Sequence, residues 1–360
     1  PMSVLREGFT TGTAAAAAAK AAALFLALRL CPAEVDTPLP GGGRLLVPVA
    51  RCQAEGLGAR AVVIKDAGDD PDVTDGAEIH ALVFQQSGLR DGEIALEAGM
   101  GVGTVTLPGL PVPPGEQAIN PGPREQIRAA VAEALEESGL GAGARVVIEI
   151  PDGAELAKRT MNPRLGIRGG LSILGTAGVV RPYSHDSWLA SIGQALSVAR
   201  AAGLTEIVLT TGRRSERFWR ALHPETPELG VVQAADFFAR ACGLAAGQGF
   251  ARITWALFFG KLVKQAQGLE CTHAKEGSLD FGGLAELCAR AGAKAETAQR
   301  AARANTALEV LELLRNDPAL PELLALLAER ATRAARDFAG PGPEIAYAVF
   351  DLDGAVLFEG

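Results

Sequence analysis

The sequence predicts two domains, an α+β domain over residues 1–143 and an α/β domain with a mostly parallel sheet over residues 144–360. The 360-residue chain is too long for one compact core, and its 48% hydrophobic content supports ordinary globular cores. Strand patterns outnumber helical patterns in the first part, whereas strands and helices alternate after residue 145, as βαβ units do. This change places the domain boundary near residues 141–145.

The first domain begins with a helix, because residues 13–30 have high helix propensity and follow threonines that can act as N-caps. Apolar patterns separated by turn residues predict strands at residues 44–50, 60–65, 78–85 and 93–98. A stretch rich in proline and glycine covers residues 107–123. Residues 124–137 then have the pattern of an amphipathic helix.

The first helix contains an apolar run at residues 14–28 that resembles the core of a signal peptide. Lys20 interrupts this run, and the uninterrupted part at residues 21–28 is far shorter than the roughly 20 residues that span a bilayer. We therefore expect a buried helix of a soluble protein, with no membrane association.

In the second domain, strands are predicted at residues 146–150, 206–210 and 252–258, and helices at residues 188–200 and 231–242. Residues 279–336 are predicted to be nearly all helical, with breaks at prolines. Residues 346–360 predict two strands around a tight turn. The turn contains a DxDG motif like that of haloacid-dehalogenase phosphatases, but the six residues after Gly354 are too few for that domain.

The composition narrows the classes of partner. A net charge of −8 gives no global basic field for nucleic acid or an anionic membrane, so an anionic ligand would need local donors. The five cysteines are scattered and form no CxxC pair, which argues against a disulfide framework or a zinc site. The cysteines are therefore expected to be reduced thiols of a cytoplasmic protein. No protein-bound metal is expected. The sequence leaves open whether the protein forms a homo-oligomer.

The start of the first helix is one candidate binding site. Thr10, Thr11, Gly12 and Thr13 lead directly into the helix, where free N–H groups, the helix dipole and three hydroxyls could bind an anion. The alternative is that these residues only cap the helix.

An acidic loop follows the predicted strand at residues 60–65. Asp66, Asp69 and Asp70 head a group of five aspartates within residues 65–76, but the spacing does not match an EF-hand. Such a loop could supply a general base or hydrogen-bond acceptors, and these three are candidate catalytic residues. A solvated acidic turn is the alternative.

Residues 162–184 form the strongest candidate binding loop, because glycines let a backbone approach a ligand closely. The loop has neither a GxGxxG nor a Walker fingerprint, which argues against the usual dinucleotide and nucleotide modes. Its arginines could pair with carboxylates. The candidate ligand contacts here are Arg164, Gly169, Gly170, Ser172, Gly175 and Thr176.

Four other polar residues are candidates. Glu116 and Asn120 lie in the stiff proline-rich segment, which could aim them at a ligand but as structure alone is a linker. Lys261 follows a predicted strand and begins a helix, and His273 closes that segment as a possible proton-transfer group. A lone histidine at a helix end is more often structural. The basic, aromatic segment at residues 212–220 is better suited to gripping an acidic small molecule than nucleic acid.

Taken together and in order, these segments resemble the CbiD family, the cobalt-precorrin-5B C1-methyltransferases of anaerobic cobalamin synthesis. The likeness runs from Gly8 to about Ala293, with a weaker likeness in the C-terminal hairpin. Four long strings carry it, at residues 8–13, 66–74, 118–124 and 162–178. The sequence departs from the family pattern at Phe258, where a histidine is typical, and at Asp236, where an asparagine is typical.

The resemblance implies an α+β domain followed by a Rossmann-like α/β domain. It also implies S-adenosylmethionine as methyl donor and cobalt-precorrin-5B as acceptor, giving cobalt-precorrin-6A. The cobalt would belong to the substrate. Methyl transfer from a sulfonium needs alignment more than an activated side chain, which agrees with the absence of a Ser-His-Asp or Cys-His pattern.

Two alternatives stay open. One is a nucleotide- or phosphate-dependent enzyme that uses the glycine loop for phosphates and the aspartate loop for Mg²⁺. The other is a non-catalytic corrinoid-binding protein of the pathway, which the departures in the last third favour.

Overall fold

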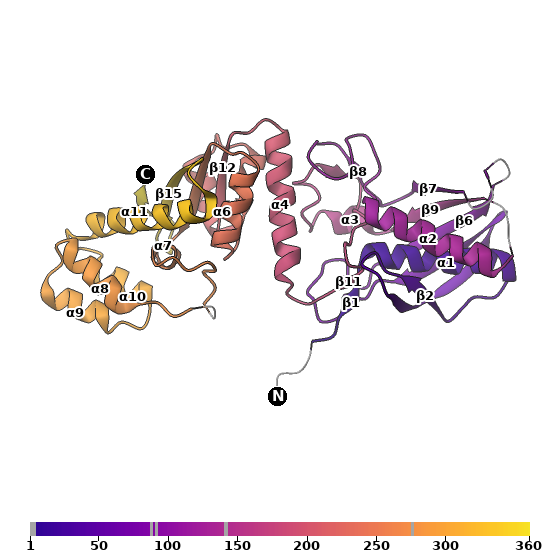
Figure 1. The fold of residues 1–360 in the computed structure, drawn as a ribbon, viewed down its shortest axis with the longest axis horizontal. Coiled ribbons are helices and arrows are strands. Elements are labelled where there is room, and N and C mark those ends of the chain that lie inside the picture. The colour runs from indigo at the N-terminus through magenta and orange to yellow at the C-terminus, as the bar shows by residue number, and fades with distance from the viewer. Residues whose placement is uncertain (1–4, 87–88, 91–92, 140–142, 275–276) are drawn as a thin grey trace. The chain divides into compact units, whose positions relative to one another are not determined.

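The computed structural model describes residues 5–86, 89–90, 93–139, 143–274 and 277–360, and it divides the chain into two compact units (Figure 1). Unit 1 is Pro1–His185 and unit 2 is Asp186–Gly360. The elements of unit 1 are β1 (Gly8–Phe9), α1 (Thr11–Leu28), β2 (Glu34–Pro38), β3 (Arg44–Pro48), β4 (Arg51–Glu55), β5 (Gly58–Ile64), β6 (Glu78–Gln85), β7 (Ile94–Ala98), β8 (Thr104–Val105), α2 (Pro121–Glu137), β9 (Ala144–Glu149), α3 (Gly153–Ala157), β10 (Ile167–Arg168) and β11 (Val179–Val180).

The main sheet of unit 1 is mixed. Its strand order is β4-β5-β6-β9-β7, and every pair is antiparallel except β7 with β9. The predicted boundary between residues 143 and 144 is therefore wrong, since β9 lies between β6 and β7 inside the first unit. A short, buried run of valine and isoleucine looks the same in a mixed sheet as in a parallel one, so the pattern alone could not assign β9.

Helix α1 is a core helix of unit 1, as predicted. Residues 11–23 are all buried, and Ala14–Ala19 have no exposed surface. By length and composition α1 could cross a membrane, but most of it packs inside the unit against α2, β5 and β6. Alanine side chains allow this close approach of helix and sheet, which explains why the run is apolar without being a membrane span.

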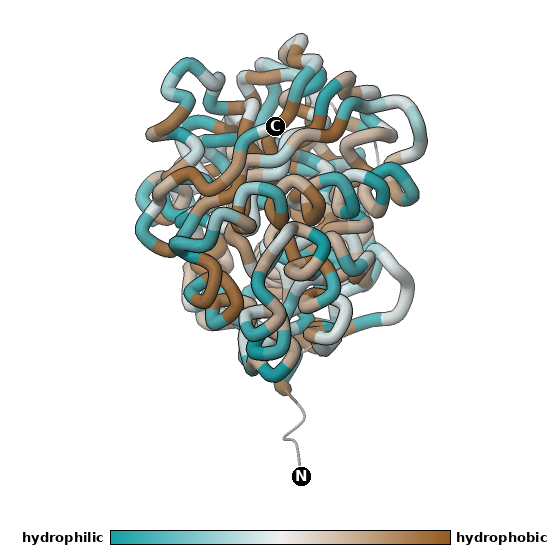
Figure 2. The backbone as a smooth tube through the Cα atoms, turned by 90° about the vertical axis from the view of Figure 1, so that its left-hand side faces the viewer, coloured by the Kyte–Doolittle hydropathy of each residue, from teal (hydrophilic) through white to brown (hydrophobic). Residues whose placement is uncertain are grey.

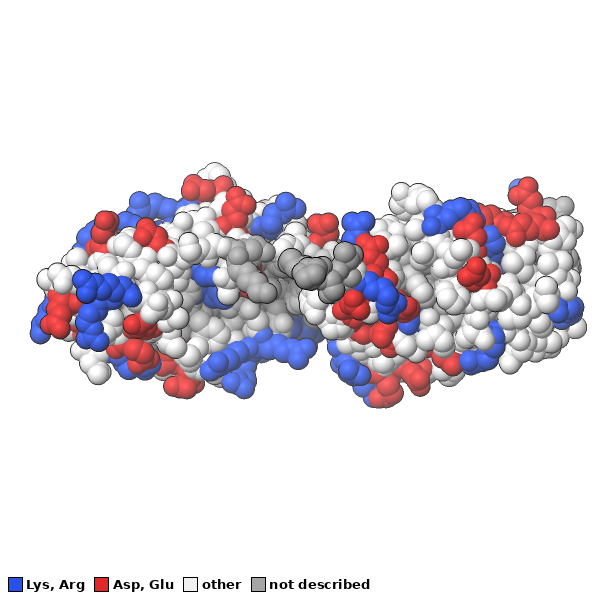
Figure 3. Space-filling view, turned by 90° about the horizontal axis from the view of Figure 1, so that it is seen from below, with Lys and Arg blue, Asp and Glu red and all other residues white. Residues whose placement is uncertain are grey.

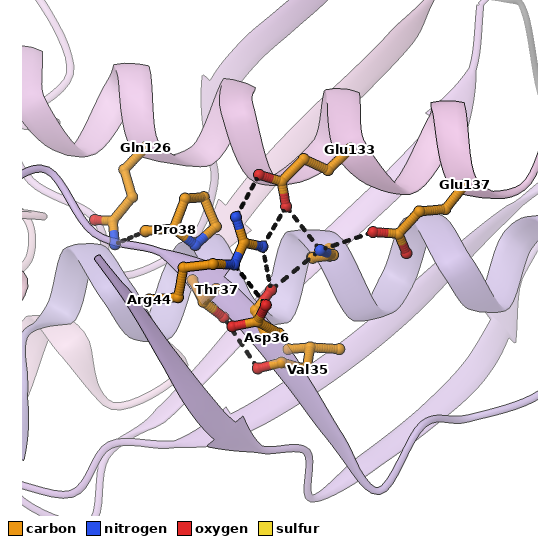
Figure 4. A network of polar contacts seen from close by, with 9 residues as sticks. Val35, Asp36, Thr37, Pro38, Arg44, Gln126, Glu133 and Glu137 are labelled. Atoms are coloured by element: carbon orange, nitrogen blue, oxygen red, sulfur yellow. Dashed lines mark hydrogen bonds and ion pairs between the residues drawn. The ribbon is translucent and has the colours of Figure 1, made fainter. Parts of the chain in front are cut away.

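One buried cation links α1 to α2. The Nζ atom of Lys20 donates to Oε2 of Glu133 at 2.7 Å, to Oε1 of Glu137 at 3.2 Å and to the backbone oxygen of Asp36 at 3.0 Å (Figure 4). Arg44 binds the same Glu133 carboxylate at 2.7 and 3.0 Å. The Arg44 hydrogen bond, followed by the contact with Lys20, lowers the pKa of Glu133 to about 2.

Unit 2 is built on a mostly parallel sheet, as predicted. Its elements, counting α4 at the junction, are α4 (His185–Ala201), β12 (Glu206–Thr210), α5 (Arg213–Leu222), the 3₁₀ helix η1 (Glu228–Gly230), β13 (Val231–Gln233), α6 (Phe238–Gly247), β14 (Arg252–Phe258), α7 (Phe259–Ala266), α8 (Phe281–Arg290), α9 (Ala295–Ala302), α10 (Ala307–Leu314), α11 (Leu320–Ala339), β15 (Glu344–Phe350) and β16 (Val356–Glu359). The strand order is β13-β12-β14-β15-β16, and only β16 is antiparallel.

The two faces of this sheet carry different helices. Trp219 and Phe218 of α5 pack on one face, against a small apolar cluster that includes Phe350. Helices α6, α7 and α11 pack on the other face and form the larger core. Figure 2 shows polar and apolar stretches alternating along the chain, as expected for elements that bury one side.

Two details of unit 2 bear on the sequence predictions. The helix predicted at residues 231–242 is wrong at its start, because Val231 and Val232 belong to the short strand β13 and α6 begins at Phe238. The C-terminal hairpin is confirmed. Its turn is held by the carboxylate of Asp351, which accepts hydrogen bonds from the backbone N–H groups of Asp353 and Ala355 at 2.9 Å.

Cys31 and Cys52 form a disulfide in this structure, with Cα atoms 5.4 Å apart. The expectation of wholly reduced thiols is therefore wrong for this pair. The cysteines are 21 residues apart, and the antiparallel pair β2–β3 reverses the chain between them. Nothing in their spacing indicates that this reversal brings them together.

Candidate functional site

The three segments of unit 1 that were predicted to bind a ligand lie next to one another. Strand β1 pairs with β11, which joins residues 8–9 to residues 179–180. The backbone N–H of Phe9 donates to the oxygen of Asp66 at 2.8 Å, and that of Thr10 donates to the oxygen of Gly178 at 3.0 Å. The start of α1 thus lies between the aspartate loop and the glycine-rich loop.

The threonines at the start of α1 are engaged within the protein. Thr10 caps the helix and accepts a hydrogen bond from the N–H of Thr13 at 3.2 Å. The Thr11 hydroxyl accepts from the N–H of Leu174 at 3.0 Å, and the Thr13 hydroxyl donates to the oxygen of Gly178 at 2.7 Å. All three threonines are buried. The geometry favours the capping role and leaves little of this helix end for a ligand.

Two predicted glycines are needed for packing. A Cβ atom at Gly170 would lie 2.1 Å from the backbone oxygen of Gly101, and one at Gly175 would lie 2.4 Å from Oγ1 of Thr10. A substitution of either glycine by valine would therefore disturb the fold, so a loss of ligand binding in such a variant would not show that the glycine contacts the ligand. Gly169 differs, because it is exposed and an added Cβ atom would meet nothing within 4 Å.

The aspartate loop anchors the chain around it. Asp66 forms an ion pair with Arg6, whose hydrogen bond holds the pKa of Asp66 below its ordinary value. The Asp69 carboxylate accepts from the backbone N–H of Arg6 at 2.7 Å, and Asp70 accepts from the N–H of Tyr183 at 3.0 Å. These contacts tie both ends of unit 1 to one loop, a role that local sequence could not reveal.

The remaining candidates of unit 1 differ in how open they are. Ser172 is buried, and its hydroxyl donates to Oδ1 of Asn162 at 3.3 Å. Arg164 is half-buried, whereas Thr176 is exposed. Asn120 is half-buried and begins α2 without capping it through its side chain. Gly12 is packed, since a Cβ atom there would lie 2.9 Å from the Pro123 ring. Asn120 and Thr176 are thus the side chains best placed to meet a ligand.

In unit 2, Lys261 lies in an internal cluster at the start of α7. Its Nζ atom forms an ion pair with Asp236 and donates to the backbone oxygen of Thr272 at 3.0 Å. Lys264 donates to the oxygens of Thr272 and His273 at 3.0 and 2.9 Å, and burial, aided by the Lys261 charge, lowers the pKa of Lys264. The His273 side chain is exposed.

This cluster explains one departure from the family pattern. Asp236 is the ionic partner of Lys261 and also accepts from the Thr272 hydroxyl at 2.8 Å, so its charge is used. Phe258, at the other departing position, packs edge-on against Phe218 at 6.1 Å between ring centres. Both residues have structural partners here.

The carboxyl edge of the parallel sheet contains a feature that the predicted site omitted. The chain runs from β12 to β13 on one side and then crosses to β14 on the other, so the loops after β12 and β14 diverge toward opposite faces. Open α/β sheets bind ligands at such a switch point. Gly212, Arg213 and Arg214 follow this strand, in the segment at residues 212–220 that the sequence already indicated for gripping an acidic small molecule.

Two residues at this edge are unusual. Thr210, the last residue of β12, has no exposed surface, and its hydroxyl has no hydrogen-bond partner within the described part of the chain. Gly212 has φ 151° and ψ −178°, a conformation that is essentially restricted to glycine. An added Cβ atom at Gly212 would meet nothing within 4 Å. A buried unpaired donor next to open backbone is the arrangement a polar ligand would complete.

The two described cavities lie elsewhere. One of about 560 Å³ in unit 2 is lined by residues at the amino edge of the sheet, including Glu206, Arg252 and Trp219. One of about 350 Å³ in unit 1 lies beside the proline-rich segment and is lined by Pro113, Arg124 and others. Trp219 of the segment at residues 212–220 lines the first cavity, and Glu116 of the proline-rich segment lines the second.

Comparison with known proteins finds matches in both units of the chain. The family model described as CbiD matches residues 2–182, and the model of the CbiD C-terminal domain matches residues 271–360. A relative from Nitratidesulfovibrio vulgaris, named cobalt-precorrin-5B C(1)-methyltransferase, is 48% identical over 99% of this chain and 92% of its own length. A relative of the same name from Salinispora arenicola is 48% identical over 82% of this chain and 76% of its own.

A solved structure, the cobalamin biosynthesis protein (cbiD) from Archaeoglobus fulgidus, is 31% identical, with 73% of this chain and 80% of that chain covered and a TM-score of 0.41. Since a family model matches half of the chain and a relative is 48% identical across nearly all of it, this chain belongs to the CbiD family.

Proposed function

We propose that this chain is a cobalt-precorrin-5B C(1)-methyltransferase of cobalamin biosynthesis, producing cobalt-precorrin-6A. The observation that carries the proposal is identity of 48% over 99% of the chain to a protein of that name. The likeness covers both units, so neither has been replaced by an unrelated domain.

The methyl donor in this proposal is S-adenosylmethionine, and the carboxyl edge of the unit 2 sheet fits it best. The Thr210 hydroxyl supplies a buried polar group without a partner in the described chain, and Gly212 leaves its backbone open to a ligand. Thr210 and the loop at residues 211–212 would hold the donor. When bound, the donor supplies a methyl group on a positively charged sulfur, which is a good leaving group.

The protein's part of the reaction is then orientation. Rigid placement of two reactants can supply roughly 7–11 kcal/mol of the barrier. Cysteine nucleophiles are not needed, and the thiols of Cys242 and Cys288 are unsuited to this role because burial raises their pKa to about 12 and about 11. The switch point places the Thr210–Gly212 turn on a rigid strand end, which suits positioning.

In unit 1 we propose Asn120, Gly169 and Thr176 as ligand contacts. The Asn120 side chain forms no capping hydrogen bond with α2, the backbone of Gly169 is open, and Thr176 is exposed. For Asp66 and its two neighbours at positions 69 and 70 we propose an anchoring role, because their carboxylates already accept hydrogen bonds from the protein.

The proposal is tested by incubating the purified chain with cobalt-precorrin-5B and methyl-labelled S-adenosylmethionine. We expect one labelled methyl group at carbon 1. Binding of the intermediate without transfer would instead favour a corrinoid carrier. Calorimetric binding of ATP with Mg²⁺ in place of S-adenosylmethionine would favour a nucleotide-dependent enzyme.

Within the described residues, no group of three histidine, cysteine, aspartate or glutamate side chains is placed to hold a metal ion.

The donor site has its own test. Thr210→Val keeps the shape of the side chain and removes a buried hydroxyl that lacks a partner, so stability should stay level or rise. Affinity for S-adenosylmethionine should fall about tenfold, since one hydrogen bond is lost (~1.4 kcal/mol). Thr205→Val, at the exposed residue before the same strand, is the matched control. If Thr210→Val binds S-adenosylmethionine as tightly as the wild type does, the methyl donor does not bind at this edge.

We also propose a cytoplasmic location. The apolar helix α1 is buried in unit 1, and the partners are small molecules of a biosynthetic pathway. Figure 3 shows both acidic and basic side chains on the visible face of each unit, and the net charge of the chain is −8, which does not favour binding to nucleic acid.

A further inference from the structure

The first turns of α5 carry a group of arginines in an electrostatically unfavourable place. Arg213 and Arg214 lie in the first turn of the helix and Arg217 follows at i+3 from Arg214, so the three guanidinium groups share one side. All three are exposed. A helix N-terminus carries partial positive charge and favours acidic side chains, so three cations there repel the helix dipole.

These arginines also lack acidic partners. Across the described ranges, no carboxylate forms an ion pair with Arg213, Arg214 or Arg217, although many other arginines of the chain are paired. Glu216, the acidic residue of the same turn, is turned inward and binds Arg220 at 3.0 Å and Gln233 at 2.6 Å. The positive charge of this surface is therefore left uncompensated by the protein.

Two of the three arginines are nevertheless held in place. Arg214 donates to the backbone oxygen of Leu352, and its guanidinium lies 5.5 Å from the ring centre of Phe258. The guanidinium of Arg217 lies 5.1 Å from the ring centre of Phe218. Stacking on aromatic rings fixes a guanidinium plane while leaving its N–H groups available to an anion.

The surface adjoins the edge proposed for the donor. Arg213 directly follows Gly212, whose backbone is open, and Thr210 lies two residues earlier with an unpaired, buried hydroxyl. By strand alternation the Thr210 side chain lies on the same face of the sheet as α5, with Val208 of the apolar cluster under that helix. The unpaired hydroxyl and the unpaired cations therefore belong to one side of one strand end.

We propose that Arg213, Arg214 and Arg217 form a carboxylate-binding surface that holds the acidic side chains of the tetrapyrrole substrate. The inference rests on the proposed function for the identity of that substrate. A donor molecule with a single carboxylate would occupy at most one of the three guanidinium groups, whereas a polycarboxylate macrocycle can engage all of them. Guanidinium groups bind carboxylates with two parallel hydrogen bonds, which gives orientation as well as affinity.

The test compares two double variants of equal charge. Arg213→Gln with Arg217→Gln removes two of the three charges and leaves the Arg214 contacts intact. Arg300→Gln with Arg303→Gln removes two exposed arginines of unit 2 near the end of α9, away from the β12 edge. Uroporphyrin, a stable polycarboxylate tetrapyrrole, serves as the binding probe by fluorescence, and circular dichroism melting checks that both variants fold.

We expect the α5 variant to bind uroporphyrin about tenfold more weakly (~1.4 kcal/mol) and the α9 variant to bind like the wild type. In the methyl-transfer assay, KM for the corrinoid should rise by a similar factor while KM for S-adenosylmethionine stays level. Equal weakening in both variants would mean non-specific charge attraction, and no weakening in either would mean no site. Both results overturn the proposal.

Other outcomes also decide it. A rise in KM for S-adenosylmethionine alone would assign the arginines to the donor and overturn the proposal. Competition by inorganic phosphate as effective as that by coproporphyrin would mark a general anion site and overturn it as well. A wild type that binds uroporphyrin through these arginines but transfers no methyl group would sink the proposed function while leaving the surface standing.

Discussion

Replacing Lys20 with methionine isolates the buried charge that links α1 to α2. Methionine keeps most of the aliphatic length, so the change removes hydrogen bonds without opening a large cavity. The Lys20 side chain is only 4% exposed, and its bond to Glu133 is charge-assisted, a class of bond that contributes about 1.5–3 kcal/mol. Breaking a fully buried ion pair can cost ~3–5 kcal/mol.

The expected cost here is lower, at about 2 kcal/mol, because the acceptors keep other partners. Glu133 retains Arg44, and the backbone oxygen of Asp36 retains an Arg44 N–H at 3.2 Å. Glu137 has a side chain that is 54% exposed, so water can replace Lys20 there.

The pH dependence has a definite sign. The folded-state pKa of Glu133 is about 2 against an ordinary 4.5, so its ionised form stabilises the fold above pH 4.5, and this contribution is lost as the pH falls toward 2. The stability difference between the wild type and Lys20→Met should narrow across the same window.

Hydrogen exchange of α1 and α2 amides in a urea series is the suitable assay, since two units need not unfold together. Lys158→Met is the matched control, because the Lys158–Glu155 pair is 67% and 76% exposed and should contribute no more than about 0.5 kcal/mol. A Lys20→Met protein as stable as the wild type, or no less stable than the control, would refute the reasoning.

Three further predictions follow from other contacts. Gly175→Ala should lower the melting temperature, because its Cβ atom would lie 2.4 Å from the Thr10 hydroxyl; calorimetry checks this, and an unchanged value would contradict the packing. Cys52→Ser should destabilise the oxidised protein by ~3 kcal/mol, from the chain entropy of the loop closed with Cys31, and should have little effect under reductant; denaturation in both conditions tests it. Thr176→Val should raise one substrate KM several-fold without changing stability, whereas unaltered kinetics would exclude it as a contact.

The parts of the fold that sequence predicts well are those with a complete local signal. Strands β6, β12 and β14 begin and end where predicted, because apolar runs are bounded by turn residues. Strands β2 and β4 were not predicted. All residues of β4 are exposed or half-buried, so the pattern that marks a buried face is absent, whereas β2 is a short strand that buries only Val35 and Thr37.

The candidate site shows a different limit. The sequence marked the start of α1, the aspartate loop and the glycine-rich loop as three separate candidates, and the structure shows that they adjoin in unit 1. The sequence could not show that Leu174 and Gly178, more than 160 residues away, supply the partners of Thr11 and Thr13. Whether a helix start is open to a ligand is decided by distant backbone, and no local spacing contains that information.

The pairing of β1 with β11 has a consequence for how the protein is made. Residues 8–9 find their strand partner only at residues 179–180, so this pairing must wait until nearly all of unit 1 has been synthesised. Until then α1, with its alanine surface, has no loop over its first turn. A nascent chain halted between α2 and β11 would thus leave the first turn of α1 uncovered, although the rest of the helix could already pack against α2, β5 and β6.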